Sequence, residues 1–130
     1  MNATLSDRTV SLPAPLPQPA LRFDVTDLGS TVVVVQIRGE ATDDQAAHLH
    51  AQLSSSLRPY TRFVILDLAG LTFADSSAVQ TLADYSRDLR REGGEVWLTG
   101  LRPAVWLALH TARLDRLFTI RASLEEAMAG

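Results

Sequence analysis

Two continuous apolar runs constrain the fold of this chain more than any other feature of its sequence. They are the segments TVVVVQIR, over residues 31–38, and FVILDL, over residues 63–68. Both suit strands that are buried on both faces of a sheet. Between them Ala46, Leu49 and Leu53 recur at helical spacing. A helix that connects two buried strands predicts a mainly parallel sheet covered by helices.

Strand and helix patterns continue this alternation along the chain. Further strands are predicted over 21–26, which can pair with 31–38 as a hairpin, and over 95–99 and 117–120. Capping residues and a first-turn proline place helix starts at Thr42 or Asp43, at Asp75 or Ser76, at Pro103 and at Ser123. The helix after Asp75 has its inner face at Val79, Leu82, Ser86 and Leu89. We predict an α/β fold with a mostly parallel, mixed sheet of about four to five strands and about four helices.

Three local expectations accompany this fold. The strand over 31–38 is expected to close at Gly39-Glu40. The strand over 63–68 is expected to lead into a short apolar loop over 71–73 that returns to the core. Trp97 and Trp106 fall within apolar patterns, so we expect both indoles to pack in the core.

The first 20 residues differ in composition from the rest. Four of the six prolines fall there, in alternation with Leu, Ala and Gln. Proline cannot donate to a sheet and favours extended conformations in the residue before it. We predict a flexible arm over 1–20, with polyproline II character, and a folded domain over 21–130. A passive tail and a partner-binding or self-docking strand both remain open for the arm.

Composition excludes several classes of function. The chain has no Cys, which removes disulfides, thiolate catalysis and Cys-ligated metals. All 12 basic residues are Arg, so a Walker A lysine and Schiff-base chemistry are absent. A net charge of -3 argues against a nucleic-acid binder. No apolar stretch approaches the roughly 20 residues needed to span a bilayer. We expect a cytoplasmic protein that neither inserts into a membrane nor binds nucleic acid.

Catalytic and cofactor motifs are missing from the sequence. His48 and His50 are two residues apart, so they cannot form the i, i+4 pair of a helical metal site. No serine lies in a G-x-S-x-G elbow, which disfavours a hydrolase that uses Ser76 or Ser77. Phosphate-binding glycine motifs are absent as well. We therefore expect a protein that uses no cofactor and is not an enzyme.

One segment combines a buried strand with an unusual helix start. The strand FVILDL is followed, after a few residues, by Asp75-Ser76-Ser77. A simple N-cap explains one polar residue here, since its side chain accepts a backbone N–H bond. It does not explain a second serine directly after the first. A serine in the first helical turn lies beside free N–H groups, which favour an anion such as a phosphate. The segment therefore suggests a regulatory serine.

Several segments together resemble the STAS domain, the fold of bacterial anti-sigma factor antagonists. The most specific is LDLAGLTFADSSA, which is similar to the family's strand, acidic turn and D-S-S-G helix start. The Gly39-Glu40 step after TVVVVQIR resembles the family's G-E-[LI]-D. The segments EVWLTGLRPAVWLAL and LDRLFTI resemble its last strands and third helix. The resemblance runs from about Leu21 to the C-terminus.

The resemblance implies a function and a site. In the family the second serine of D-S-S is phosphorylated, which here is Ser77. Asp75 would assist recognition or position the hydroxyl, and Ser76 would mainly cap the helix. The unphosphorylated protein would bind an anti-sigma factor with serine-kinase activity and release the sigma factor. Phosphorylation of Ser77 would end this binding, and a serine phosphatase would restore it.

Two departures from the family pattern bear on the partner. Ala78 stands where the family usually has glycine. After Glu40, the family's aspartate is replaced by Thr42 or shifted to Asp43, in a loop that contributes to the family's partner surface. An alternative is a STAS interaction subunit outside sigma control, either in a stress-signalling scaffold or in a lipid-transport ABC system.

Overall fold

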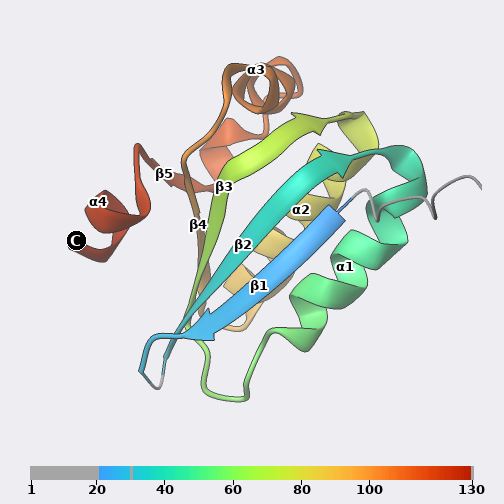
Figure 1. Ribbon diagram of the computed structural model, residues 1–130. Helices are drawn as coiled ribbons and strands as arrows, with labels where there is room; N and C mark the ends of the chain where they lie inside the picture. Colours follow the sequence, from blue (N-terminus) through green and yellow to red (C-terminus); the bar gives the residue numbers. More distant parts are fainter. Residues whose placement is uncertain (1–20, 30, 130) are drawn as a thin grey trace, which may run out of the picture.

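Five strands form one sheet in the order β1-β2-β3-β4-β5, in a computed structural model that describes residues 21–29 and 31–129 (Figure 1). The strands are β1 (Leu21–Asp27), β2 (Val32–Ala41), β3 (Phe63–Ala74), β4 (Glu95–Thr99) and β5 (Thr119–Arg121). β1 pairs with β2 antiparallel, and every later pairing is parallel. The predicted hairpin and mixed, mostly parallel sheet are confirmed. The arm predicted over 1–20 lies outside the described residues.

In the described part of the chain four helices cover the sheet, as predicted. They are α1 (Ala46–Ser55), α2 (Ser76–Arg91), α3 (Pro103–Thr111) and α4 (Leu124–Ala129), with 3-10 turns η1 (Asp43–Gln45) and η2 (Asp115–Leu117). Pro103 occupies the first turn of α3. The Ser123 Oγ accepts a bond of 3.1 Å from the Glu126 N–H at the start of α4. No helix within the described ranges is long and apolar enough to cross a membrane.

The central strands are buried on both faces, as their unbroken apolar pattern predicts. Val33, Val35 and Ile37 of β2 enter the main core, together with buried residues of α1, α2 and α3. Val34 and Ile65 face the other side, where they form a smaller cluster with Ala127 of α4. The long helices α1 and α2 thus cover one face of the sheet, and the short helix α4 covers part of the other.

Two predicted strand ends are wrong. β2 continues through Gly39 to Ala41, and β3 continues to Ala74 through the segment that was expected to be a loop. Irregularities in the β2–β3 register, after Gln36 and after Gly39, allow the two strands to stay paired over this distance. A bulge bends a strand without ending it, so the glycine does not terminate the pairing.

Two further expectations need correction. β5 begins at Thr119, because the residues up to Leu117 form the turn η2. Trp106 is 41% exposed and stacks on His110 rather than packing in the core. Val105 and Leu109, four residues apart, occupy the buried face of α3, so the indole of the residue after Val105 lies on the outer side. Trp97 is half-buried.

Tyr85 of α2 couples the stability of the fold to alkaline pH. Its hydroxyl donates to the Leu53 carbonyl of α1 at 3.2 Å, and burial raises the pKa of the phenol well above its ordinary value. The unfolded chain releases this proton from about pH 10 upward, whereas the folded chain keeps it. Tyr85 should therefore contribute its full stabilisation below about pH 10, and this contribution should be lost as the pH rises above that value.

The composition makes this dependence measurable. The chain has two tyrosines and no Lys or Cys, so few other side chains titrate in that range. Denaturant unfolding between pH 8 and pH 11.5, values chosen to bracket the ordinary tyrosine pKa, should show a steeper alkaline loss for the wild type than for Tyr85→Phe. The exposed Tyr60 provides the matched control. Equal slopes for wild type and Tyr85→Phe would contradict the assignment.

Candidate functional site

The predicted site residues meet where β2 and β3 end and α2 begins. β2 leads into η1, and β3 leads through Asp75 into α2 (Figure 1). The Asp75 N–H donates to the Ala41 carbonyl at 3.0 Å, so the two chain segments remain tied beyond the last strand residues. Parallel strands place their carboxyl ends at one edge of a sheet, which is where ligand sites of α/β folds usually lie.

Asp75 is the N-cap of α2. Its backbone is extended, and its Oδ1 accepts a bond of 3.0 Å from the Ala78 N–H. Of the two predicted capping residues, Asp75 therefore caps the helix, while Ser76 is exposed in the first turn. Ala78, which stands in the family's glycine position, is buried, so its methyl group is accommodated in the core.

The Ser77 side chain is hydrogen-bonded to a residue of the turn η1. Its Oγ donates to Asp43 Oδ1 at 2.8 Å, across 34 residues of sequence. Of the two alternatives left open after Glu40, Asp43 is thus the residue that meets the serine. Thr42 donates instead to the Asp44 carboxylate, and it makes no capping bond. The prediction that Thr42 or Asp43 caps the following helix is wrong. The turn η1 lies before α1, and there the Thr42 hydroxyl donates to Asp44 while the Asp43 carboxylate accepts from Ser77.

The surroundings of Ser77 are acidic. Glu40, Asp43, Asp44 and Asp75 all lie on the two segments that meet here. None of the four forms an ion pair with another residue of the described part of the chain. The half-buried Ser77 hydroxyl therefore lies beside the Asp43 carboxylate, with the first turn of α2 as the nearby source of free N–H groups.

Sequence reasoning missed two residues of this site. Asp44 was not distinguished from its neighbours, although it receives the Thr42 hydrogen bond. Phe73 was expected to return to the core, but it is 44% exposed and lies four residues before Ser77. A phenylalanine between buried Leu71 and buried Ala74 carries no sequence signal of exposure, because the register irregularity that lies between Leu71 and Phe73 is not visible in the sequence.

The Asp75 cap gives the site a measurable energetic contribution. Asp75→Ala should lower the free energy of unfolding by about 1 kcal/mol, because the Ala78 N–H loses its acceptor. Urea unfolding measures this loss. Asp75→Asn keeps a capping oxygen and should recover most of it, while Ser76→Ala should have little effect. A larger loss for Ser76→Ala than for Asp75→Ala would mean that the cap is assigned to the wrong side chain.

Comparison with known proteins identifies the family of this fold. The family model described as the STAS domain matches residues 23–127. The chain belongs to the STAS domain family.

Two of the similar proteins are anti-sigma factor antagonists by description, and two solved structures share the fold. BtrV of Bordetella bronchiseptica, assigned as an anti-sigma factor antagonist, is 26% identical over 98 residues, covering 75% of this chain and 84% of that protein. The crystal structure of an anti-sigma factor antagonist from Mycobacterium paratuberculosis superposes with a TM-score of 0.74 at 24% identity, covering 91% and 97% of the two chains. The phosphorylated form of the Bacillus cell fate determinant SpoIIAA gives 0.65 at 22% identity, covering 83% and 97%.

Proposed function

We propose that this protein is an anti-sigma factor antagonist. Its unphosphorylated form binds an anti-sigma factor with serine-kinase activity and releases the sigma factor, and phosphorylation of Ser77 ends the binding. The hydrogen bond between Ser77 Oγ and Asp43 Oδ1, in the first turn of α2, is the observation that carries this proposal. The antagonist assignment of BtrV and the phosphorylated structure of SpoIIAA support it.

The hydroxyl of Ser77 is arranged to accept a phosphoryl group. Its proton points to Asp43, so the lone pairs of Oγ are left for an incoming phosphorus atom. Asp43 acts here as a positioning residue, since phosphoryl transfer depends chiefly on alignment and charge stabilisation. The kinase supplies ATP and its metal ion, and this chain is the substrate.

The same arrangement explains how phosphorylation acts as a switch. A phosphoserine carries about -1.5 to -2 charges at pH 7. At Ser77 this charge is added beside Asp43 and close to Asp75, where the local field is already negative. The free N–H groups of the helix start tolerate the phosphate. The surface presented to the partner changes its charge without unfolding of the domain.

The partner surface follows from the residues that surround Ser77. It comprises acidic and polar side chains and an exposed aromatic ring, from Glu40, Thr42, Asp43, Asp75, Ser76 and Phe73. Ala78 is buried beneath these residues, so it supports the surface without contacting the partner. Such a surface offers a partner both polar groups and an apolar contact. We propose a cytoplasmic switch protein that uses neither cofactor, nucleic acid nor membrane insertion, and a serine phosphatase that resets it.

Phosphate transfer by candidate anti-sigma kinases tests this function. Mass spectrometry after incubation with ATP should locate phosphate on Ser77 in the wild type and in Ser76→Ala, and none in Ser77→Ala. Asp43→Ala should reduce the rate about tenfold, the effect of losing a hydrogen bond to a charged group. Asp43→Asn retains an acceptor and should lose less. An unmodified Ser77 with every kinase tested would reject the switch and direct the search to partners outside sigma control.

A further inference from the structure

The strand β1 forms one edge of the sheet. Within the described part of the chain it pairs with β2 alone, and Figure 1 shows it (blue) as the outermost strand. The open edge of a strand presents a row of backbone N–H and C=O groups that can pair with another strand. β1 has seven residues, whereas β5 at the other edge has three. The β1 edge therefore offers the longer surface for pairing with a second chain.

The ladder between β1 and β2 determines which backbone groups point outward. In an antiparallel pair, opposite residues alternate between bonded and non-bonded pairs. The Leu28 N–H donates to the Val32 carbonyl at 2.8 Å, and the register continues without a shift along the whole of β1. Counting back from Leu28 in steps of two leaves Leu21, Phe23 and Val25 between the bonded positions. Their backbone N–H and C=O groups therefore point away from β2.

Two exposed charges of opposite sign lie in the first half of β1. Leu21 and Phe23 face the main core, so Arg22 and Asp24 lie on the outer face of the sheet, opposite α1 and α2. The Asp24 carboxylate is 3.9 Å from the Arg38 guanidinium, but 64% of its side chain is exposed, which leaves room for a second cation. Charges on an edge strand usually oppose pairing. Here their signs and spacing allow an antiparallel copy of the strand to match them.

We propose that two copies of this chain associate by antiparallel pairing of their β1 strands about a two-fold axis at Phe23. Phe23 of one copy then lies opposite Phe23 of the other, and Leu21 lies opposite Val25, so the outward backbone groups bond to one another. In the same register Arg22 lies opposite Asp24 on both sides of the axis. These are non-bonded positions, where Cα atoms are about 4.5 Å apart and side chains are closest.

Charge disfavours the neighbouring registers. The second strand can slip only in steps that keep outward backbone groups opposite outward groups. One step in one direction places Arg22 opposite Arg22, and one step in the other direction places Asp24 opposite Asp24. Like charges directly opposite each other destabilise a strand pair. The charges of β1 therefore match a second copy of β1 in one register, which is the argument for this partner.

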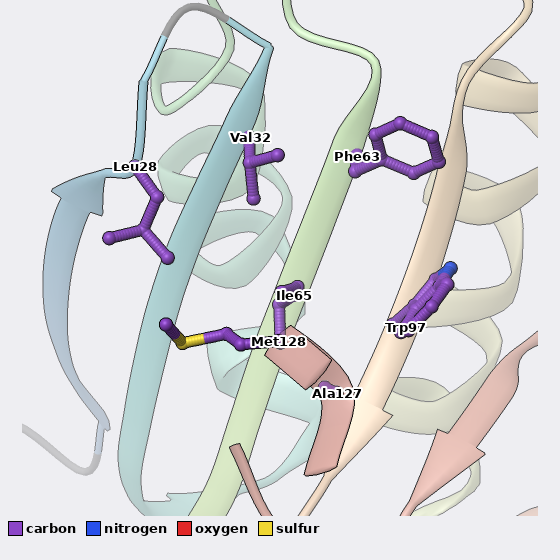
Figure 2. Close-up of a pocket in the computed structure, with 7 residues that line it drawn as sticks. All are labelled: Leu28, Val32, Phe63, Ile65, Trp97, Ala127 and Met128. Atoms are coloured by element: carbon purple, nitrogen blue, oxygen red, sulfur yellow. The ribbon is translucent and has the colours of Figure 1, made fainter. Parts of the chain in front are cut away.

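The pairing is confined to residues 21–25. Pro19 would lie opposite Asp27 of the second copy, and a proline has no N–H to donate. Beyond Asp27 the outer face becomes apolar, because Leu28 lines a groove of about 350 Å³ whose opposite wall includes Phe63 and Trp97 (Figure 2). An interface of five residues from each chain is small, so we expect reversible association with a dissociation constant of roughly 0.1 to 1 mM.

The pairing does not depend on the proposed function. β2 separates β1 from β3, and Ser77 lies beyond β3 in the first turn of α2. A chain that cannot be phosphorylated still carries the β1 edge, and a chain with altered β1 charges still carries Ser77. The loss of one property in an experiment therefore does not imply the loss of the other.

Charge reversal in the full-length protein tests the pairing. Arg22→Asp places acidic residues opposite acidic residues, and Asp24→Arg places basic residues opposite basic residues. Each variant should self-associate roughly tenfold more weakly than the wild type. An equimolar mixture of the two variants brings opposite charges together again and should associate as the wild type does, and so should the double variant. Sedimentation equilibrium at concentrations on both sides of the expected dissociation constant measures each case.

A matched variant controls for net charge. Asp27→Arg changes the net charge as Asp24→Arg does, but it lies outside the paired residues and should leave self-association unchanged. Circular dichroism and the emission of Trp97, which lies on β4 away from the interface, verify that each variant is folded. The proposal is overturned if the wild type stays monomeric throughout the range or if neither reversal weakens association. It is also overturned if the mixture associates no better than the single variants, or if Asp27→Arg weakens association as much as Asp24→Arg.

Discussion

Ser77→Asp is expected to weaken binding to the anti-sigma partner by roughly 10- to 100-fold, or about 1.4 to 2.7 kcal/mol. The substitution removes the hydroxyl proton that Asp43 accepts at 2.8 Å and places a second carboxylate at the same position. Like charges side by side repel each other, so the new carboxylate is expected to displace Asp43 and to disturb the arrangement of side chains that the partner binds. Isothermal titration calorimetry with the purified kinase measures the difference.

Two companion variants separate charge from shape. Ser77→Asn has nearly the size of aspartate without its charge, so it should retain most of the affinity. Ser77→Ala should retain affinity and resist phosphorylation. Because part of the repulsion is screened by salt, the gap between Asp and Asn variants should narrow at high ionic strength. Equal weakening by Asn and Asp would mean that bulk, not charge, operates the switch. Unchanged affinity of the Asp variant would remove the switch altogether.

Leu82→Ala is expected to lower the free energy of unfolding by about 2 to 5 kcal/mol. Leu82 is 1% exposed and lies on the inner face of α2, the helix that begins with Ser76 and Ser77. Its truncation leaves a cavity that close-packed neighbours fill only in part. For a domain with a total stability of about 5 to 15 kcal/mol, this is a large share. Guanidinium unfolding followed by circular dichroism measures the change.

Leu107→Ala is the control for this prediction. Leu107 is 62% exposed on α3, so the same chemical deletion should change stability by no more than about 0.5 kcal/mol. A similar loss in both variants would indicate that the exposed side of α3 is covered in solution. A negligible loss for Leu82→Ala would contradict the packing of α2 against the sheet.

The alternation of apolar runs and helical spacing was sufficient to predict the order of elements and the inner face of α2. The strand ends were not predictable in the same way, because Gly39 normally signals a turn and here lies within a bulged strand. Trp106 was misplaced for a related reason. Composition shows that a residue is apolar, but only the phase of α3, set by Val105 and Leu109, determines which side of the helix carries it.

The contact between Asp43 and Ser77 depends on the register of β2 against β3. Ala41 pairs with Ala74, so the chain segments that follow them start side by side, and two or three more residues bring the carboxylate to the hydroxyl. With the strands expected to stop near Gly39 and Leu68, this proximity could be inferred only from resemblance.

The bond between the Asp75 N–H and the Ala41 carbonyl has a consequence for newly made chains. The serine and its aspartate come from segments that are joined only after β2 and β3 have paired in parallel, a contact between distant parts of the sequence. Such pairings form slowly, since loop closure must precede them. If, as proposed, a kinase requires both side chains in place, it should modify only chains that have finished folding. Phosphorylation of Ser77 would then follow the pairing of β2 with β3 and would not occur on incomplete molecules.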